Sequence, residues 1–133
     1  MASILRVDTL TDASSNNSVA TSVLFGGSGK AWISFNGVDG TPAAKDSFGT
    51  STLTDNGTGD YTQALSSAMV NALYVHSGSA GVNDGSGNAT SLRNYGYNTA
   101  RTQSTTVYNM NCSYDNSNAI DAYIASVVHG DLA

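Results

Sequence analysis

Apolar and polar residues alternate with a period of two along short segments of this chain. The clearest case is KAWISFN (30–36), where Ala31, Ile33 and Phe35 fall on one face and Trp32 and Ser34 on the other. Residues 105–113 repeat the pattern, with large side chains at every second position. Because successive side chains of a strand point to opposite faces of its sheet, this alternation predicts half-buried β-strands.

Turn-forming residues separate many segments of this kind. The Asn-Gly step in DNGTG (55–59) accepts a positive φ and predicts a hairpin across residues 46–65, while polar runs at 11–18 and 78–90 predict loops. Strands are predicted over residues 4–10, 19–25, 30–36, 46–54, 61–65, 72–77, 91–97, 105–113 and 120–129. About eight to ten short, evenly spaced strands predict an all-β protein, an antiparallel, jelly-roll-like β-sandwich.

The composition strengthens this interpretation and adds a constraint on the core. All ten acidic residues are Asp, and Gly, Ser, Thr and Asn together make up 60 of the 133 residues. These residue types favour turns and strands over helices, and the length fits one domain. Val, Leu, Ile and Phe contribute only 25 residues. The core is therefore expected to be thin, and contacts between copies of the chain would add burial.

Net charge, cysteine content and apolar runs limit which partners the protein can have and where in the cell it is made. The net charge is −5 and the isoelectric point is near 4.4, which argues against nucleic acid as a partner. The single cysteine, Cys112, cannot form an intrachain disulfide. We also expect no membrane insertion, because no apolar run reaches spanning length. The first residues lack the apolar stretch of a signal peptide, so synthesis in a cytoplasm without export by that route is expected.

Candidate chemistry is sparse. DNGTGD (55–60) and NDGSGN (83–88) offer oxygen ligands in Gly-rich loops, but Ca²⁺ needs six to eight oxygens, so turns are favoured over calcium sites. His76 and His129 sit in apolar strand patterns without metal-ligand spacing, and packed or surface histidines are favoured. Ser28 lacks the spacing of a nucleophile elbow, and nothing pairs two carboxylates. We therefore expect no enzyme, and no catalytic, cofactor or metal site.

The aromatic residues carry polar tips on apolar bodies, which suits subunit interfaces, sugar stacking and core packing alike. Core packing is expected for Trp32, Tyr61 and Tyr123. Tyr95 and Tyr97 flank Gly96 close to the longest loop, so these two are the better candidates for contact with an outside partner.

Five segments together resemble a known group of proteins. They are ILRVDTLTDASSNNS (4–18), GKAWISFNG (29–37), KDSFGTSTLTDNGTGDYT (45–62), SSAMVNALYVHSG (66–78) and DAYIASVVHGD (121–131). The order of these motifs is similar to that of small tail-fibre-like proteins and fibre domains encoded by bacteriophages, including many phages of marine bacteria.

This resemblance implies a virion structural protein, a short tail-fibre or fibre-like adhesion module that contributes to particle assembly and host attachment. It implies a homotrimer, an N-terminal virion-attachment segment within residues 1–18, and a single sandwich domain over residues 19–133. The expected anchor residues are Ile4, Leu5, Val7 and Leu10. The expected contacts to a host cell-surface glycan are Asn83, Asp84, Ser86, Asn88, Tyr95 and Tyr97. The alternative is a decoration (cement) protein of capsid or tail that binds no receptor; a depolymerase is a third, weaker hypothesis.

Overall fold

The computed structural model describes residues 6–14, 17–81, 91–93, 103–113 and 118–133. Along the chain, its strands and helix are β1 (Thr9–Thr11), β2 (Ser18–Ala20), α1 (Thr21–Gly27), β3 (Gly29–Asn36), β4 (Ala44–Phe48), β5 (Thr50–Gly57), β6 (Asp60–Leu65), β7 (Val75–Gly81), β8 (Ser91–Arg93), β9 (Val107–Ser113) and β10 (Tyr123–His129). The predicted all-β class is confirmed, since the described residues contain one short helix beside these strands.

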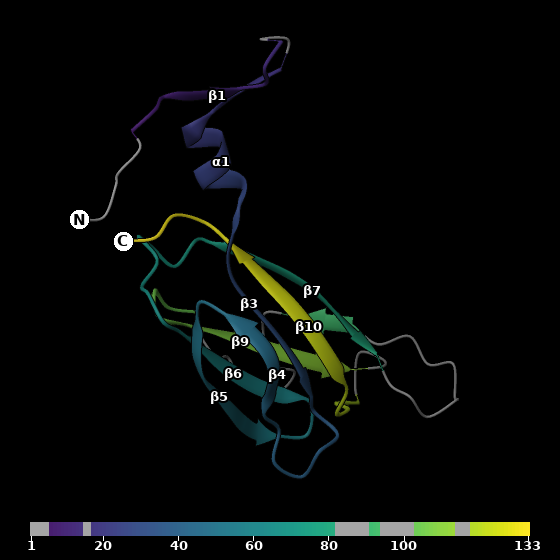
Figure 1. Cartoon of the computed structure of the whole chain (residues 1–133). Helices are drawn as coiled ribbons and strands as arrows, with labels where there is room; N and C mark the ends of the chain where they lie inside the picture. The colour runs from purple at the N-terminus through teal and green to yellow at the C-terminus, as the bar shows by residue number, and fades with distance from the viewer. Residues whose placement is uncertain (1–5, 15–16, 82–90, 94–102, 114–117) are drawn as a thin grey trace, which may run out of the picture.

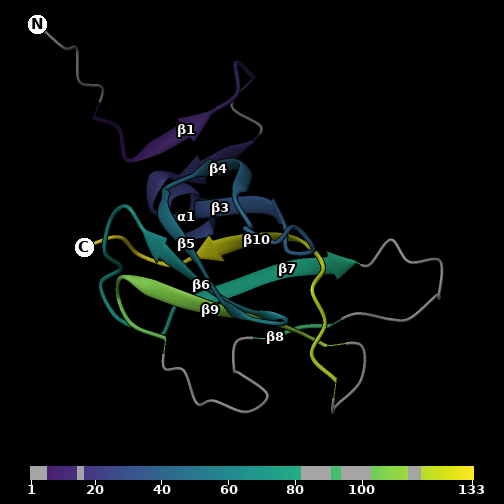
Figure 2. The ribbon, with the colours of Figure 1, turned by 90° about the horizontal axis from the view of Figure 1, so that it is seen from below.

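Two four-stranded antiparallel sheets form the body of the molecule (Figures 1 and 2). One sheet has the strand order β4-β3-β10-β7 and the other has the order β5-β6-β9-β8. Strands β3 and β4 pair with each other, as do β5 and β6, whereas β10 returns from the end of the chain to lie between β3 and β7. This arrangement agrees with the predicted antiparallel sandwich.

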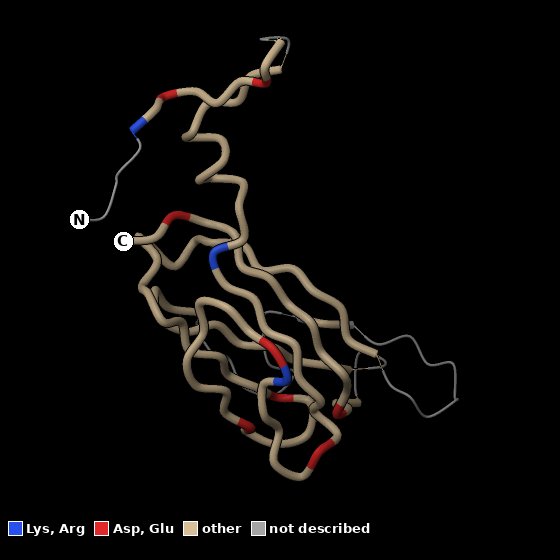
Figure 3. The backbone as a smooth tube through the Cα atoms, in the orientation of Figure 1, with Lys and Arg blue, Asp and Glu red and all other residues tan. Residues whose placement is uncertain are grey.

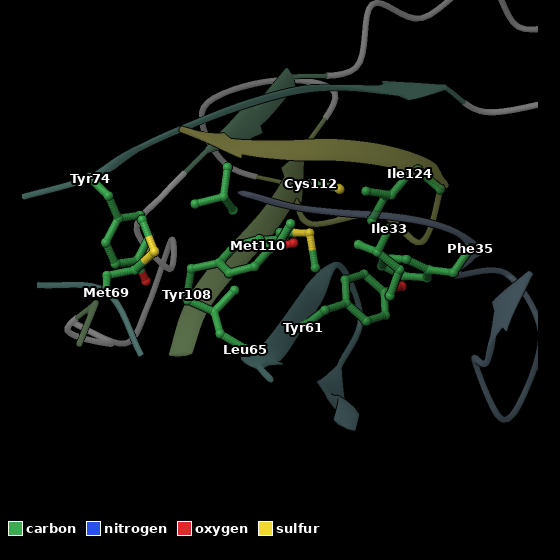
Figure 4. Close-up of a cluster of buried hydrophobic side chains, with 13 residues drawn as sticks. Ile33, Phe35, Tyr61, Leu65, Met69, Tyr74, Tyr108, Met110, Cys112 and Ile124 are labelled. Atoms are coloured by element: carbon green, nitrogen blue, oxygen red, sulfur yellow. The ribbon is translucent and has the colours of Figure 1, made fainter. Parts of the chain in front are cut away.

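The core lies between the two sheets and is built by the alternation seen in the sequence (Figure 4). The residues predicted on one face of β3, namely Ala31, Ile33 and Phe35, are all buried. They meet the inward residues of the facing sheet, and the rings of Phe35 and Tyr61 pack edge to face with centroids 5.0 Å apart. Strand β9 contributes Tyr108, Met110 and Cys112, as its alternation predicts.

The strand predicted over residues 46–54 is in fact two strands in different sheets. Gly49 separates β4 from β5 with a φ of +67°, and a Cβ there would lie 2.4 Å from the carbonyl oxygen of Lys30. Because only glycine tolerates this conformation and this approach, the chain leaves one sheet at Gly49 and enters the other. The predicted hairpin across 46–65 is therefore correct only for β5 and β6.

The strand predicted over residues 19–25 was also wrong, because only residues up to Ala20 are extended and α1 follows at once. The helix places Thr21, Leu24 and Phe25, at positions i, i+3 and i+4, along one groove with β1. An extended chain would point Leu24 and Phe25 in opposite directions. The helix therefore brings Leu24 and Phe25 to this groove, although both side chains remain exposed.

Two of the three aromatic residues expected in the core lie outside it. Tyr61 is buried, whereas Trp32 is 37 % exposed and Tyr123 is 44 % exposed. Both project from the outer face of the β4-β3-β10-β7 sheet, because they alternate with the buried residues of β3 and β10. Their size suggested burial, but their position in the alternating pattern decides the face.

The remaining strand boundaries differ by a few residues. Strand β7 begins at Val75 rather than at residue 72 and continues to Gly81, and β10 begins at Tyr123 rather than at residue 120. The turn after β5 is centred on Thr58 and Gly59 rather than on the Asn-Gly step, and a positive φ occurs both at Gly57 (+127°), as that step predicted, and at Gly59 (+65°). Of the strand predicted over 91–97, residues 94–97 lie outside the described part.

Candidate functional site

The predicted receptor contacts and half of the predicted anchor fall outside the part of the chain that the structure describes. Asn83, Asp84, Ser86, Asn88, Tyr95 and Tyr97 all lie outside the described residues, as do Ile4 and Leu5 of the predicted anchor. The other two anchor residues, Val7 and Leu10, are described and exposed. They belong to a unit that stands apart from the sandwich in Figure 1, at the end where the chain enters β3.

We call this unit the N-terminal arm and define it as the described residues 6–14 and 17–27. Strand β1 pairs with β2, and the backbone N–H of Thr21 at the start of α1 donates to the carbonyl of Asp8, 2.9 Å away. Between β1 and α1 lies a groove of about 540 Å³ whose apolar lining includes Val7, Leu10, Leu24 and Phe25. The arm therefore has its own internal pairing but no buried residue in its helix.

The apolar side chains of α1 are presented to solvent rather than to the sandwich. Phe25 is 68 % exposed and Val23 is 62 % exposed. Exposed apolar side chains are ordinary when they are scattered, but a group of them around a groove marks a contact surface. Val7 and Leu10 were predicted from the sequence, whereas α1 was missed; the short apolar run before Gly26 and Gly27 was the available signal.

Lys30 joins the arm to the sandwich. Its ammonium Nζ donates to the carbonyl oxygen of Phe25 at the end of α1 and lies 5.9 Å from the centre of the Phe25 ring. Nζ also lies 2.9 Å from Oγ of Ser28, the residue that ends the helix. A cation beside the last carbonyls of a helix is favourable, so this contact orients the arm where the chain passes into β3.

The acidic turn between β5 and β6 behaves as a structural turn. Asp55 accepts a hydrogen bond from the backbone N–H of Gly57 at 2.9 Å, and the N–H of Gly59 donates to Asp121 Oδ1 at 2.7 Å. The carboxylates thus bond to nearby backbone groups. No group of three or more potential metal ligands occurs among the described residues. The second Gly-rich candidate, at 83–88, lies outside them.

The two histidines do not form a pair. They lie on neighbouring strands β7 and β10, but His76 points into the sandwich whereas His129 lies across from the exposed Val75. The His76 ring packs against Tyr108 with centroids 5.2 Å apart, and burial lowers the pKa of His76 below its ordinary value. His76 is therefore a neutral core histidine, as the apolar pattern around it predicted.

Cys112 is also part of the core and not a nucleophile. Burial, helped by the nearby negative charge of Asp121, raises the pKa of the thiol to about 12. Because the thiolate is the reactive form, this side chain is inert at neutral pH. Tyr74 and Tyr108 likewise have pKa values raised to about 12, mainly by burial.

The second surface feature is a shallow groove on the outer face of the β4-β3-β10-β7 sheet. Two adjoining hollows of about 350 and 430 Å³ share Ser34, Ser79 and Ala125 in their lining. Trp32 lines the first hollow and Tyr123 lines the second. We call this the sheet groove, and the sequence could have indicated it, because alternation sets Trp32 and Ser34 opposite the core face.

Comparison with known proteins adds no family to these observations. The chain matches no protein-family model, no curated protein sequence and no solved structure. Within the part of the chain that the structure describes, no helix has the length and apolar character needed to cross a membrane.

Proposed function

We propose that this chain is a structural protein of a bacteriophage particle, a short fibre-like adhesion module that is attached to the particle through its N-terminal arm. The single observation that carries the proposal is the arm itself, whose exposed apolar side chains surround a groove while the sandwich forms a separate body. Such a surface suits a protein partner, since burial of apolar area is the main favourable term in association.

The sequence supports the same proposal. Five segments resemble phage tail-fibre-like proteins, and they are spread from the arm to the last strand. The first of them, residues 4–18, overlaps the part of the arm that precedes α1. In this proposal Val7 and Leu10 act as anchor residues together with Leu24 and Phe25 of α1. The chain assembles as a homotrimer, in which neighbouring copies cover exposed strand edges such as β4 and β7.

The arm can be tested on phage particles that lack this chain. Purified wild-type protein is added to such particles, and the retained fraction is measured after sedimentation. We expect retention of the wild type and a loss of at least about tenfold for Phe25→Asp, because a charge would be buried in the contact. Leu73→Asp is the matched control, since Leu73 is 87 % exposed and lies outside the arm.

Three results would overturn parts of this proposal. If wild-type protein is not retained, or if Phe25→Asp is retained equally well, the arm is not the anchor. If the wild-type protein is retained, adsorption of the reconstituted particles to host cells distinguishes an adhesion module from a cement protein. Particles that regain the protein but adsorb no better than deficient particles would favour a decoration protein of capsid or tail.

A further inference from the structure

The sheet groove runs across three strands whose outward side chains follow a simple order. On β3 these are Trp32 and Ser34, and the register places Trp32 beside Val127 and Ser34 beside Ala125 on β10. Tyr123 stands four residues from Val127 on the same strand. With a rise of about 3.3 Å per residue, the aromatic residues lie in rows about 13 Å apart along the sheet.

Small side chains between these rows make the face concave. Strand β7 pairs Ser77 with Val127, Ser79 with Ala125 and Gly81 with Tyr123. The middle of the groove is therefore floored by Ser34, Ala125 and Ser79, which the two hollows share. An aromatic ring at each end and hydroxyl groups between them give an elongated site, open along its length, on strands that are already ordered by their pairing.

The charge of the lining restricts the ligand. Among the described residues that line the two hollows, Lys45 is the one with a charged side chain, and its Nζ lies 5.8 Å from the centre of the Tyr123 ring. This contact helps to hold the ring in position. Acidic residues outnumber Lys and Arg along the backbone (Figure 3), and the whole chain carries a net charge of −5, which disfavours acidic polymers. The groove thus suits a neutral ligand with alternating apolar faces and hydroxyl groups.

We propose that the sheet groove binds a neutral polysaccharide chain, with Trp32 and Tyr123 as stacking platforms and the hydroxyls of Ser34 and Ser79 as hydrogen-bonding partners. Sugar rings present C–H faces to aromatic side chains and hydroxyl groups to serines, so both parts of the lining have a complement. This inference deepens the adhesion part of the proposed function and rests on it. A second copy is a poorer occupant, because two concave faces placed together would leave their hollows unfilled.

The test uses the full chain and a panel of soluble neutral polysaccharides, namely dextran, mannan, galactomannan and mixed-linkage β-glucan, with alginate as an acidic comparison. Binding is measured by affinity gel electrophoresis, in which a bound polymer retards the protein. We expect retardation by at least one neutral polymer and none by alginate. Trp32→Ala and Tyr123→Ala should each weaken binding about tenfold, and Trp32→Phe should weaken it less.

Control variants keep the result interpretable. Leu73→Ala removes an exposed apolar side chain outside the groove and should bind like the wild type. Thermal melting by circular dichroism checks that Trp32→Ala and Tyr123→Ala remain folded. If both melt early, Ser79→Arg on β7 blocks the groove by bulk and should abolish the retardation.

Three outcomes would overturn the inference. One is the absence of retardation by every neutral polymer, and another is retardation that the groove variants leave unchanged. The third is a wild-type oligomer that Trp32→Ala dissociates, which would identify the face as an interface between copies. Phe25→Asp separates the two proposals, because it should lose particle retention while keeping polysaccharide binding.

Discussion

At the scale of single residues, His76 is a titratable group held in the core. It packs against the Tyr108 ring, and in the described part of the molecule its Nδ1 atom is buried without a hydrogen-bond partner. The hydroxyl of Tyr108 lies 3.0 Å from Oγ of Ser126, which in turn lies 3.4 Å from the sulfur of Met110. These neighbours are neutral, so nothing among them offsets the cost of placing a positive charge on the imidazole.

We predict that stability falls as the pH is lowered from 7 to 5. Burial holds the folded-state pKa of His76 below its ordinary value of about 6.5. The unfolded chain therefore gains a proton that the folded chain does not, and the unfolded state is favoured increasingly below pH 6.5. The midpoint of thermal unfolding should drop in this range for wild type.

Variants of the two histidines test whether the pH dependence of stability comes from His76. His76→Gln should show a flatter pH dependence between 7 and 5, although its melting temperature at pH 7 should be lower because the ring contact is lost. His129→Gln is the matched control and should melt with the pH profile of the wild type. A wild-type melting temperature that stays constant over this range would contradict the prediction.

At the scale of elements, the passage from one sheet to the other depends on Gly49. Its positive φ lets β4 end and β5 begin within a single residue, and the backbone of Lys30 passes directly beside it. Ser66 also donates its backbone N–H to the carbonyl of Gly49 at 2.9 Å. The crossing is thus held from both sides.

We predict that Gly49→Ala destabilises the fold by about 2–4 kcal/mol, because the added Cβ meets backbone atoms in a conformation that alanine disfavours. Urea denaturation gives the free energy of unfolding. Gly26→Ala is the control, since Gly26 lies in α1 with open space around its Cα. That variant should change stability by less than about 1 kcal/mol. Equal effects at the two positions would refute this account of the crossing.

Sequence patterns predicted the strands in which large apolar side chains occupy every second position, and they missed the elements that are defined by one glycine or by a short apolar run. Strands β3 and β9 could be recognised because one face of each is apolar or aromatic. Gly49 could not be distinguished from other glycines, because its role depends on the distant backbone of Lys30. Helix α1 was missed because its short apolar run was interpreted as part of a strand over residues 19–25.

At the scale of the whole molecule, a small polar network joins the two sheets at one end of the sandwich. The hydroxyl of Tyr61, on β6, lies 2.8 Å from Asp121 Oδ1 and 3.1 Å from the carbonyl oxygen of Gly37. The same Asp121 oxygen accepts from the N–H of Gly59. Asp121 and Gly37 adjoin β10 and β3, so this network links the two layers.

We predict that Asp121→Ala destabilises the protein by about 2–4 kcal/mol, because it leaves the backbone N–H of Gly59 without its acceptor and the buried Tyr61 hydroxyl with only the carbonyl oxygen of Gly37. Tyr61→Phe should cost less, about 1–2 kcal/mol, since it removes one hydrogen bond and keeps the ring in the core. Asp121→Asn retains an acceptor oxygen and should have the smallest effect. Urea denaturation ranks the three variants, and the opposite order for Asp121→Ala and Asp121→Asn would show that the carboxylate does not link the layers.

The candidate sites were less predictable than the fold, for a reason that also concerns the whole molecule. The anchor role of Val7 and Leu10 stays a prediction that rests on the resemblance to fibre-like proteins, and the structure shows only that both side chains are exposed beside a groove. The sheet groove depends on which residues of three strands become neighbours, and that register is a property of the complete sheet. The assignment of Trp32 and Tyr123 to the core was a separate error, because the alternation within each strand already sets them opposite the buried residues.

The position of Trp32 also determines what can be observed in solution. It is the sole indole of the chain, and it lies at the mouth of the sheet groove rather than between the layers. Its fluorescence is consequently an intrinsic optical reporter of whatever occupies that groove, with no added dye. Conformational changes in the core between the two sheets will hardly alter the tryptophan fluorescence. They must be followed by the absorbance or fluorescence of the buried tyrosines or by circular dichroism.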